Sequence, residues 1–168
     1  MVLDFNADEI FEMAEQIERN GAQFYRNMAQ KTKYPSASKF LLDFAAMEEQ
    51  HEKIFASMRS ELSAREKEPI VFDPEGVGTE YLRALADMRV FDKNADKEFV
   101  LPEGLTEKEK TEKILWAAMG IEKESIVFYV GMKEYVPENL GKGKIDGIIK
   151  EEMKHIRALG NKLSSLAG

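Results

Sequence analysis

Apolar residues recur at steps of three and four along four stretches of the chain, a spacing that predicts four long amphipathic helices. Breakers separate them: Pro35 follows the first stretch, Pro69 the second and Pro137 the third. Thr106 and Glu109 have the spacing of a capping box at the start of the third helix. We therefore expect helices over about 6–30, 36–67, 106–136 and 144–166.

The connection between the second and third helices is long, at about residues 68–105. A structureless loop of that length is uncommon in a compact domain, and the spacing over 79–89 predicts a short extra helix within it. Short turns make each flanking helix pair antiparallel, whereas the long connection can cross the bundle. The pattern thus predicts an all-α, single-domain four-helix bundle over residues 1–168, with helix pairs at about 6–67 and 106–166.

The two predicted helix pairs repeat each other. Glu18 is matched by Glu122, and the motif Glu48-x-x-His51 is matched by Glu152-x-x-His155. The offset is the same throughout, because 122 − 18, 152 − 48 and 155 − 51 all equal 104. A chain built from two similar halves can form a two-fold symmetric centre between them.

These polar residues fall on the apolar stripes of their helices. Phe44, Glu48, His51 and Phe55, for example, follow one another at helical steps of three and four. Carboxylates turned into a core are costly unless they are paired or bind metal. Two divalent cations balance four carboxylates in charge, and two imidazoles add neutral ligands. This donor set favours iron or manganese, accommodates zinc and disfavours calcium and magnesium. The candidate metal ligands are Glu18, Glu48, His51, Glu122, Glu152 and His155.

Composition excludes several other classes of protein. The chain contains no cysteine, which rules out disulfides, thiolate metal sites and a cysteine nucleophile. The net charge of −7 argues against a general nucleic-acid surface. No apolar stretch reaches the roughly 20 residues of a membrane span, and the acidic start of the sequence lacks the features of a signal peptide. We expect a cytoplasmic protein with neither nucleic acid nor membrane as a partner.

The paired motifs resemble those of the rubrerythrin-like branch of the ferritin-like superfamily, including Phe24-Tyr25 and Phe128-Tyr129 after the first Glu of each half. The resemblance implies a ferritin-like bundle with two iron ions. It makes Glu18 and Glu122 terminal ligands, Glu48 and Glu152 bridging ligands, and His51 and His155 the remaining ligands. It places Tyr25 and Tyr129 near the centre, where a phenol can hydrogen-bond a ligand or a bound oxygen species. Packing of these tyrosines as ordinary core residues is the alternative.

Two departures from rubrerythrins proper bear on function. Ser125 stands where they carry a further Glu, and His155 stands where they carry Glu, so the ligand set is more similar to that of bacterioferritin. No rubredoxin-type cysteine module is present. The resemblance implies a non-haem di-iron oxidoreductase that reduces hydrogen peroxide or dioxygen and protects against peroxide. An external donor, a rubredoxin-like protein or reductase, would supply electrons, and the family resemblance also implies a homodimer.

Three other functions remain open at this point. The same centre could oxidise iron(II) for storage or detoxification, as a ferroxidase does. Alternatively, metal could only tie the four helices together, without redox turnover. Oxygenation of an organic substrate would need a pocket beside the metals. Aromatic residues of the crossover could cover such a pocket, namely Phe72, Tyr81, Phe91 and Phe99. These residues could equally cap the end of the bundle or pack against a partner subunit.

Overall fold

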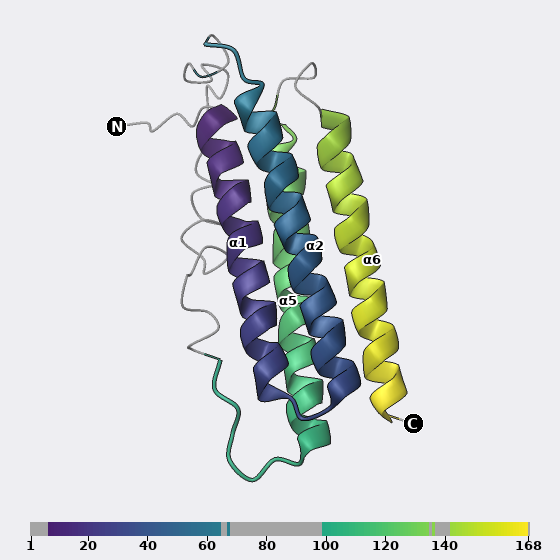
Figure 1. Cartoon of the computed structure of the whole chain (residues 1–168). Coiled ribbons are helices and arrows are strands. Elements are labelled where there is room, and N and C mark those ends of the chain that lie inside the picture. Colours follow the sequence, from purple (N-terminus) through teal and green to yellow (C-terminus); the bar gives the residue numbers. More distant parts are fainter. Residues whose placement is uncertain (1–6, 65–66, 68–98, 135, 137–141, 168) are drawn as a thin grey trace, which may run out of the picture.

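Four helices form a bundle in the computed structural model, which describes residues 7–64, 67, 99–134, 136 and 142–167. Helices α1 and α2 make one antiparallel pair, and α5 and α6 make the other, while α2 and α5 run parallel (Figure 1). This is the all-α bundle with one long crossover that the sequence predicts. The helices span Ala7–Lys31, Pro35–Ser60, Glu107–Met132 and Lys142–Ala167.

The predicted start of the third long helix is confirmed. Thr106 caps α5, its hydroxyl accepting from the Glu109 backbone N–H while the Glu109 carboxylate accepts from the Thr106 backbone N–H. The predicted ends are less accurate. Helix α2 stops at Ser60 rather than near residue 67, and the chain then turns and buries Leu62. Helix α5 likewise stops at Met132, before Pro137.

The core consists of two apolar clusters, one towards each end of the bundle, and each draws side chains from all four helices. On α1, for example, Ile10 to Ile17 belong to one cluster and Phe24 to Ala29 to the other. The polar residues singled out by the repeat lie in the layer between the clusters. The predicted stripes are thus buried as expected, and they isolate a buried polar layer near the middle of the bundle.

Only the last part of the crossover is described. Phe99 packs edge-on against Phe24 with ring centroids 6.2 Å apart, and Lys31 donates to the Phe99 carbonyl at 3.1 Å. The predicted short helix over 79–89, with the aromatic residues before Phe99, lies outside the described residues. None of the described helices is both long enough and apolar enough to cross a membrane.

Candidate metal centre

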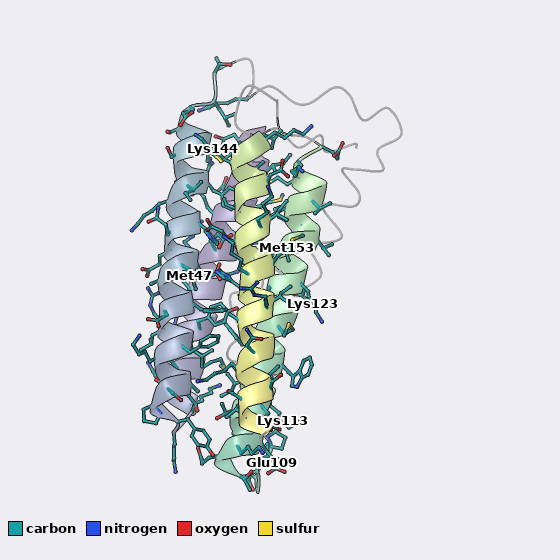
Figure 2. The ribbon with its side chains drawn as sticks, turned by 90° about the vertical axis from the view of Figure 1, so that its right-hand side faces the viewer. Met47, Glu109, Lys113, Lys123, Lys144 and Met153 are labelled. Carbon is teal, nitrogen blue, oxygen red and sulfur yellow. The ribbon has the colours of Figure 1, made fainter. Side chains whose placement is uncertain are left out.

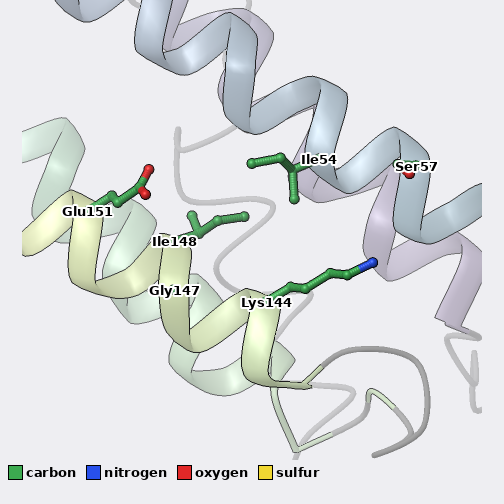
Figure 3. A pocket seen from close by; sticks show the side chains of 6 residues that line it. All are labelled: Ile54, Ser57, Lys144, Gly147, Ile148 and Glu151. Atoms are coloured by element: carbon green, nitrogen blue, oxygen red, sulfur yellow. The ribbon is translucent and has the colours of Figure 1, made fainter.

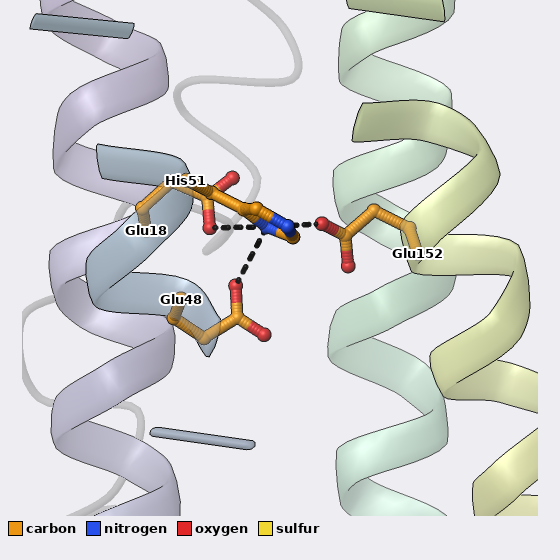
Figure 4. Close-up of side chains that lie close together, drawn as sticks. All are labelled: Glu18, Glu48, His51 and Glu152. Carbon is orange, nitrogen blue, oxygen red and sulfur yellow. Dashed lines mark ion pairs between the residues drawn. The ribbon is translucent and has the colours of Figure 1, made fainter. Parts of the chain in front are cut away.

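All six predicted ligands meet in the polar layer, and all six are buried. They form two overlapping groups whose ligand atoms lie within 4.8 Å of one another. Figure 4 shows the first group, with three carboxylates gathered around the imidazole of His51. Glu48 and Glu152 are common to both groups, while each group has its own Glu and His. The groups are Glu18, Glu48, His51 and Glu152, and Glu48, Glu122, Glu152 and His155.

The two histidines present the same ring nitrogen to the carboxylates. Nδ1 of His51 lies 2.7 Å from Glu152 Oε1 and 3.5 Å from Glu18 Oε2. Nδ1 of His155 lies 3.1 Å from Glu152 Oε2 and 3.3 Å from Glu122 Oε2. The rings are nearly parallel, with an interplanar angle of 16° and centroids 5.7 Å apart. The three-residue spacing of each Glu-x-x-His motif puts both side chains on the inner face of one helix.

Two tyrosines join the halves crosswise. Tyr25 on α1 donates its hydroxyl proton to Glu122 on α5, and Tyr129 on α5 donates to Glu18 on α1. Both rings are fully buried. Burial and the neighbouring carboxylates raise the pKa of both phenols well above the ordinary value, so each remains a proton donor. Each tyrosine therefore makes a hydrogen bond to a candidate ligand. This is one of the two roles expected from the sequence, the other being packing as an ordinary core residue.

Burial dominates the electrostatics of the carboxylates. It raises the pKa of Glu18 and, more strongly, those of Glu48 and Glu122, where neighbouring carboxylates add to the effect. Burial also opposes ionisation of Glu152, but contacts with Glu122 and both histidines outweigh it and lower the Glu152 pKa. A cation that binds these carboxylates therefore competes with protons, because burial favours the neutral form of Glu18, Glu48 and Glu122.

The histidines hold protons strongly in this environment. Burial disfavours the imidazolium of His155, but Glu122 and Glu152 outweigh that effect and raise its pKa to about 10. Burial also disfavours the imidazolium of His51, but the neighbouring carboxylates, chiefly Glu152, outweigh burial and raise the His51 pKa. A cation that binds here must therefore compete with protons on both rings.

Unsatisfied buried atoms show that the residues fit a bound metal. Glu18 Oε2, Glu48 Oε1, His51 Nδ1 and both carboxylate oxygens of Glu152 have no hydrogen-bond partner among the described residues. His51 Nδ1 and Glu152 Oε1 are close, but they are not aligned for a hydrogen bond. Gly21 lies beside Glu48, since a Cβ there would be in van der Waals contact with Cγ of Glu48 at 3.4 Å. Buried oxygens and a ring nitrogen that converge unpaired are the donor set that iron, manganese or zinc accepts.

A family model described as Rubrerythrin matches residues 9–163. The chain belongs to the rubrerythrin family. A crystal structure from Thermotoga maritima, of a protein provisionally described as a ferritin-like diiron-carboxylate protein, superposes with a TM-score of 0.64. The two sequences are 23% identical, the match covers 96% of each chain, and it shows the shared fold. No curated protein matches the chain. Membership of the rubrerythrin family and the buried carboxylate–histidine cluster together indicate a metal cofactor and fit a di-iron protein.

The sequence interpretation missed two residues at this rubrerythrin-family centre. Glu151 lies beside the candidate ligand Glu152, and its carboxylate accepts a hydrogen bond from the Nε2–H of His51 at 2.8 Å. Gly21 on α1 lies next to Glu48, a proximity that the sequence interpretation did not identify. Comparison of the two halves at the 104-residue offset could have indicated Glu151, because the equivalent position is Met47.

Proposed function

We propose that this protein is a di-iron oxidoreductase of the rubrerythrin type, which reduces hydrogen peroxide or dioxygen with electrons from an external donor. The observation that carries the proposal is the membership of Glu48 and Glu152 in both ligand groups. Two sites that share two carboxylates are suited to two adjacent cations. Glu18 with His51, and Glu122 with His155, would complete the separate sites. Manganese or zinc could occupy the same donors.

Two bound iron ions would supply electrons for reduction of the oxidant, which for peroxide is two electrons and two protons to give two waters. The side chains of the protein position the carboxylates and retain protons. Tyr129 and Tyr25 fix the carboxylates of Glu18 and Glu122 by hydrogen bonds and keep their own protons at the hydroxyl oxygen. The apolar clusters on both sides exclude water from the polar layer, which strengthens every electrostatic interaction there.

The test begins with anaerobic loading of metal-free protein with iron(II) and counting of the bound iron. Rapid mixing with peroxide, and separately with dioxygen, then follows the ferric absorption. Binding of about two irons per chain and a much faster response to peroxide, with turnover sustained by an added donor, would support the proposal. Failure to bind about two metals of any kind would refute it.

A ferroxidase role in iron handling is the second candidate. It is favoured by the histidine at position 155, which makes the ligand set more similar to that of bacterioferritin than to that of rubrerythrins proper. The same experiment separates the two roles. A faster response to dioxygen, with consumption of iron beyond the two that are bound, would assign the ferroxidase role.

A further inference from the structure

Exposed apolar side chains gather on the outward side of the α5–α6 pair. Trp116 is 60% exposed, Met153 54% and Val130 52%. Trp116 and Val130 lie on α5, and Figure 2 shows Met153 on the adjacent α6. On the described helices α1 and α2, by contrast, Leu42 is the large apolar side chain with comparable exposure. Apolar patches of this kind mark interaction surfaces.

Cations flank these apolar residues. Lys123 lies seven residues from both Trp116 and Val130, a spacing that puts the three on one face of α5. Three more cations follow one another at steps of four and three on the exposed side of α6, namely Lys150, Lys154 and Arg157. All four cations are exposed, and none of them has an ion pair within the described part of the chain. We call these four cations, together with the three apolar residues, the outer face.

The acidic residues of α6 do not neutralise these cations. Glu151 points towards α2, where it lines a pocket between the two helices (Figure 3) and pairs with His51 at 2.8 Å. Asp146 pairs with Lys133 at the end of α5. Glu152 is buried in the metal centre. The carboxylates of α6 therefore leave the positive charge of the outer face unbalanced.

The internal repeat provides a comparison, because the first helix pair presents the opposite surface. At the 104-residue offset, Val130 and Met153 correspond to Arg26 and Glu49, which form an ion pair between α1 and α2. The equivalent of Trp116 is an ion-paired glutamate of α1. The α1–α2 pair thus closes its outward side with its own charges, whereas the outer face leaves apolar area and positive charge exposed.

The outer face lies directly outside the metal centre. Met153 and Lys154 stand between the candidate ligands Glu152 and His155 in the sequence, and Lys123 follows the candidate ligand of α5. The same helical turns therefore carry ligands inward and the outer face outward. One helix, about 10 Å across, separates the two.

We propose that the outer face is the docking surface for a small acidic protein that carries one electron at a time. This inference rests on the proposed function, for which the carrier is the external electron donor. The four cations complement a carboxylate-rich partner and steer its approach, while aromatic residues and methionine are enriched in interfaces. Each docked carrier gives up one electron and leaves oxidised. Two successive encounters replace the two electrons that reduction of one peroxide consumes.

A second copy of this chain fits the outer face less well. Pairing about a two-fold axis sets one patch against the same patch of the other copy. Two sets of unbalanced cations would then enter one interface, and like charges brought together in this way oppose association. A partner of opposite charge meets no such opposition.

The chain itself supplies a reporter for the test. Trp116 is its one tryptophan, so the indole N–H signal in the NMR spectrum of ¹⁵N-labelled full-length protein reports contact at the outer face. The probes are an unlabelled zinc-substituted rubredoxin and a flavodoxin, both of net negative charge, and a cytochrome c of net positive charge. We expect the two acidic carriers to shift the signal in a saturable way that weakens as salt is added. The cytochrome c should not shift it.

Two variants separate charge from apolar contact. K150Q/K154Q/R157Q removes three cations and should weaken binding of the acidic carriers about 10-fold or more at low salt. Its matched control, K33Q/K39Q/K53Q, makes the same change in net charge at exposed lysines of the other half and should bind as the wild type does. V130R/M153E gives the outer face the ion pair of the other half at unchanged net charge, and it should also lose binding. Circular dichroism checks that each variant retains its helices.

The outcomes distinguish this inference from the proposed function. An indole signal that neither acidic carrier moves, or equal weakening by the control variant, would overturn the docking surface alone. A wild-type dimer in sedimentation that V130R/M153E dissociates, with no carrier contact, would assign the outer face to a second copy and overturn it too. Carrier contact at Trp116 in a protein that binds no iron would support the docking surface and refute the di-iron function.

Discussion

Tyr129→Phe removes one buried hydroxyl and leaves the ring that packs beside Phe55 in place. That hydroxyl donates to Glu18 Oε1, while the other oxygen of the same carboxylate has no hydrogen-bond partner among the described residues. Removing one partner of a buried hydrogen bond leaves the other unsatisfied, at a cost of about 1–3 kcal/mol. We therefore expect metal-free Tyr129→Phe to lose about 2 kcal/mol of unfolding free energy, or roughly 4–8 °C in Tm for a domain of this size.

Urea unfolding of chelator-treated protein, followed by helical circular dichroism, measures this loss as a shift of the midpoint at unchanged slope. Tyr25→Phe should lose a similar amount, because Tyr25 makes the equivalent bond to Glu122. Tyr34→Phe is the matched control. Tyr34 is 38% exposed, so the same chemical change there should alter the unfolding free energy by no more than about 0.5 kcal/mol.

A loss in Tyr129→Phe no larger than that in Tyr34→Phe would refute the assignment of a stabilising phenol–carboxylate bond. A large loss at only one of the two buried tyrosines would instead show that the two halves are not energetically equivalent in the metal-free protein. Either result would be visible in the urea midpoints alone.

Three other perturbations test separate parts of the structure. Glu48→Ala removes a carboxylate common to both ligand groups, so bound metal should fall well below two per chain by elemental analysis; a variant that retains two would contradict the shared role. Arg59 holds the pKa of Asp8 below its ordinary value, so ionised Asp8 stabilises the fold above its unfolded pKa of about 4, and that contribution is lost as pH falls through the lower folded pKa. Asp8→Asn should accordingly lower the urea midpoint at neutral pH and flatten its acid dependence; an unchanged profile would refute this. Thr106→Ala should cost about 1 kcal/mol by removing the cap of α5, whereas Thr106→Ser should retain most of it.

The sequence predicted which six polar residues gather in the core, because these residues break a strong local rule. Glu48 and His51 are polar residues on an apolar helical stripe, and the same violation recurs 104 residues later. A buried charged residue on such a stripe needs a partner, so the pattern itself points to a shared site. The structure brings all six residues together, and their action as metal ligands stays a prediction that the loading experiments test.

The features that sequence could not supply depend on contacts between helices. Glu151 lies one residue before a predicted ligand, and the pattern of α6 alone does not show that it reaches His51 on α2. The end of α2 depends on a turn that buries Leu62, which outweighs the helical propensity of the residues that follow Ser60. The expected homodimer and electron donor stay predictions, because both depend on surfaces that meet other molecules.

The crosswise tyrosine bonds show that the two helix pairs are related by an approximate two-fold symmetry. This symmetry bears on how the residues around the two halves can come to differ. Two separate copies of one hairpin, assembled about a two-fold axis, must carry the same side chain at every equivalent position. Any substitution beside one half of such a centre would therefore appear beside the other half as well. A single polypeptide that contains both hairpins escapes this constraint, so Phe44 can pack against His155 while the equivalent residue in the other half is Ile148. Covalent linkage of the halves thus permits the two sides of the buried polar layer to differ in their surrounding residues.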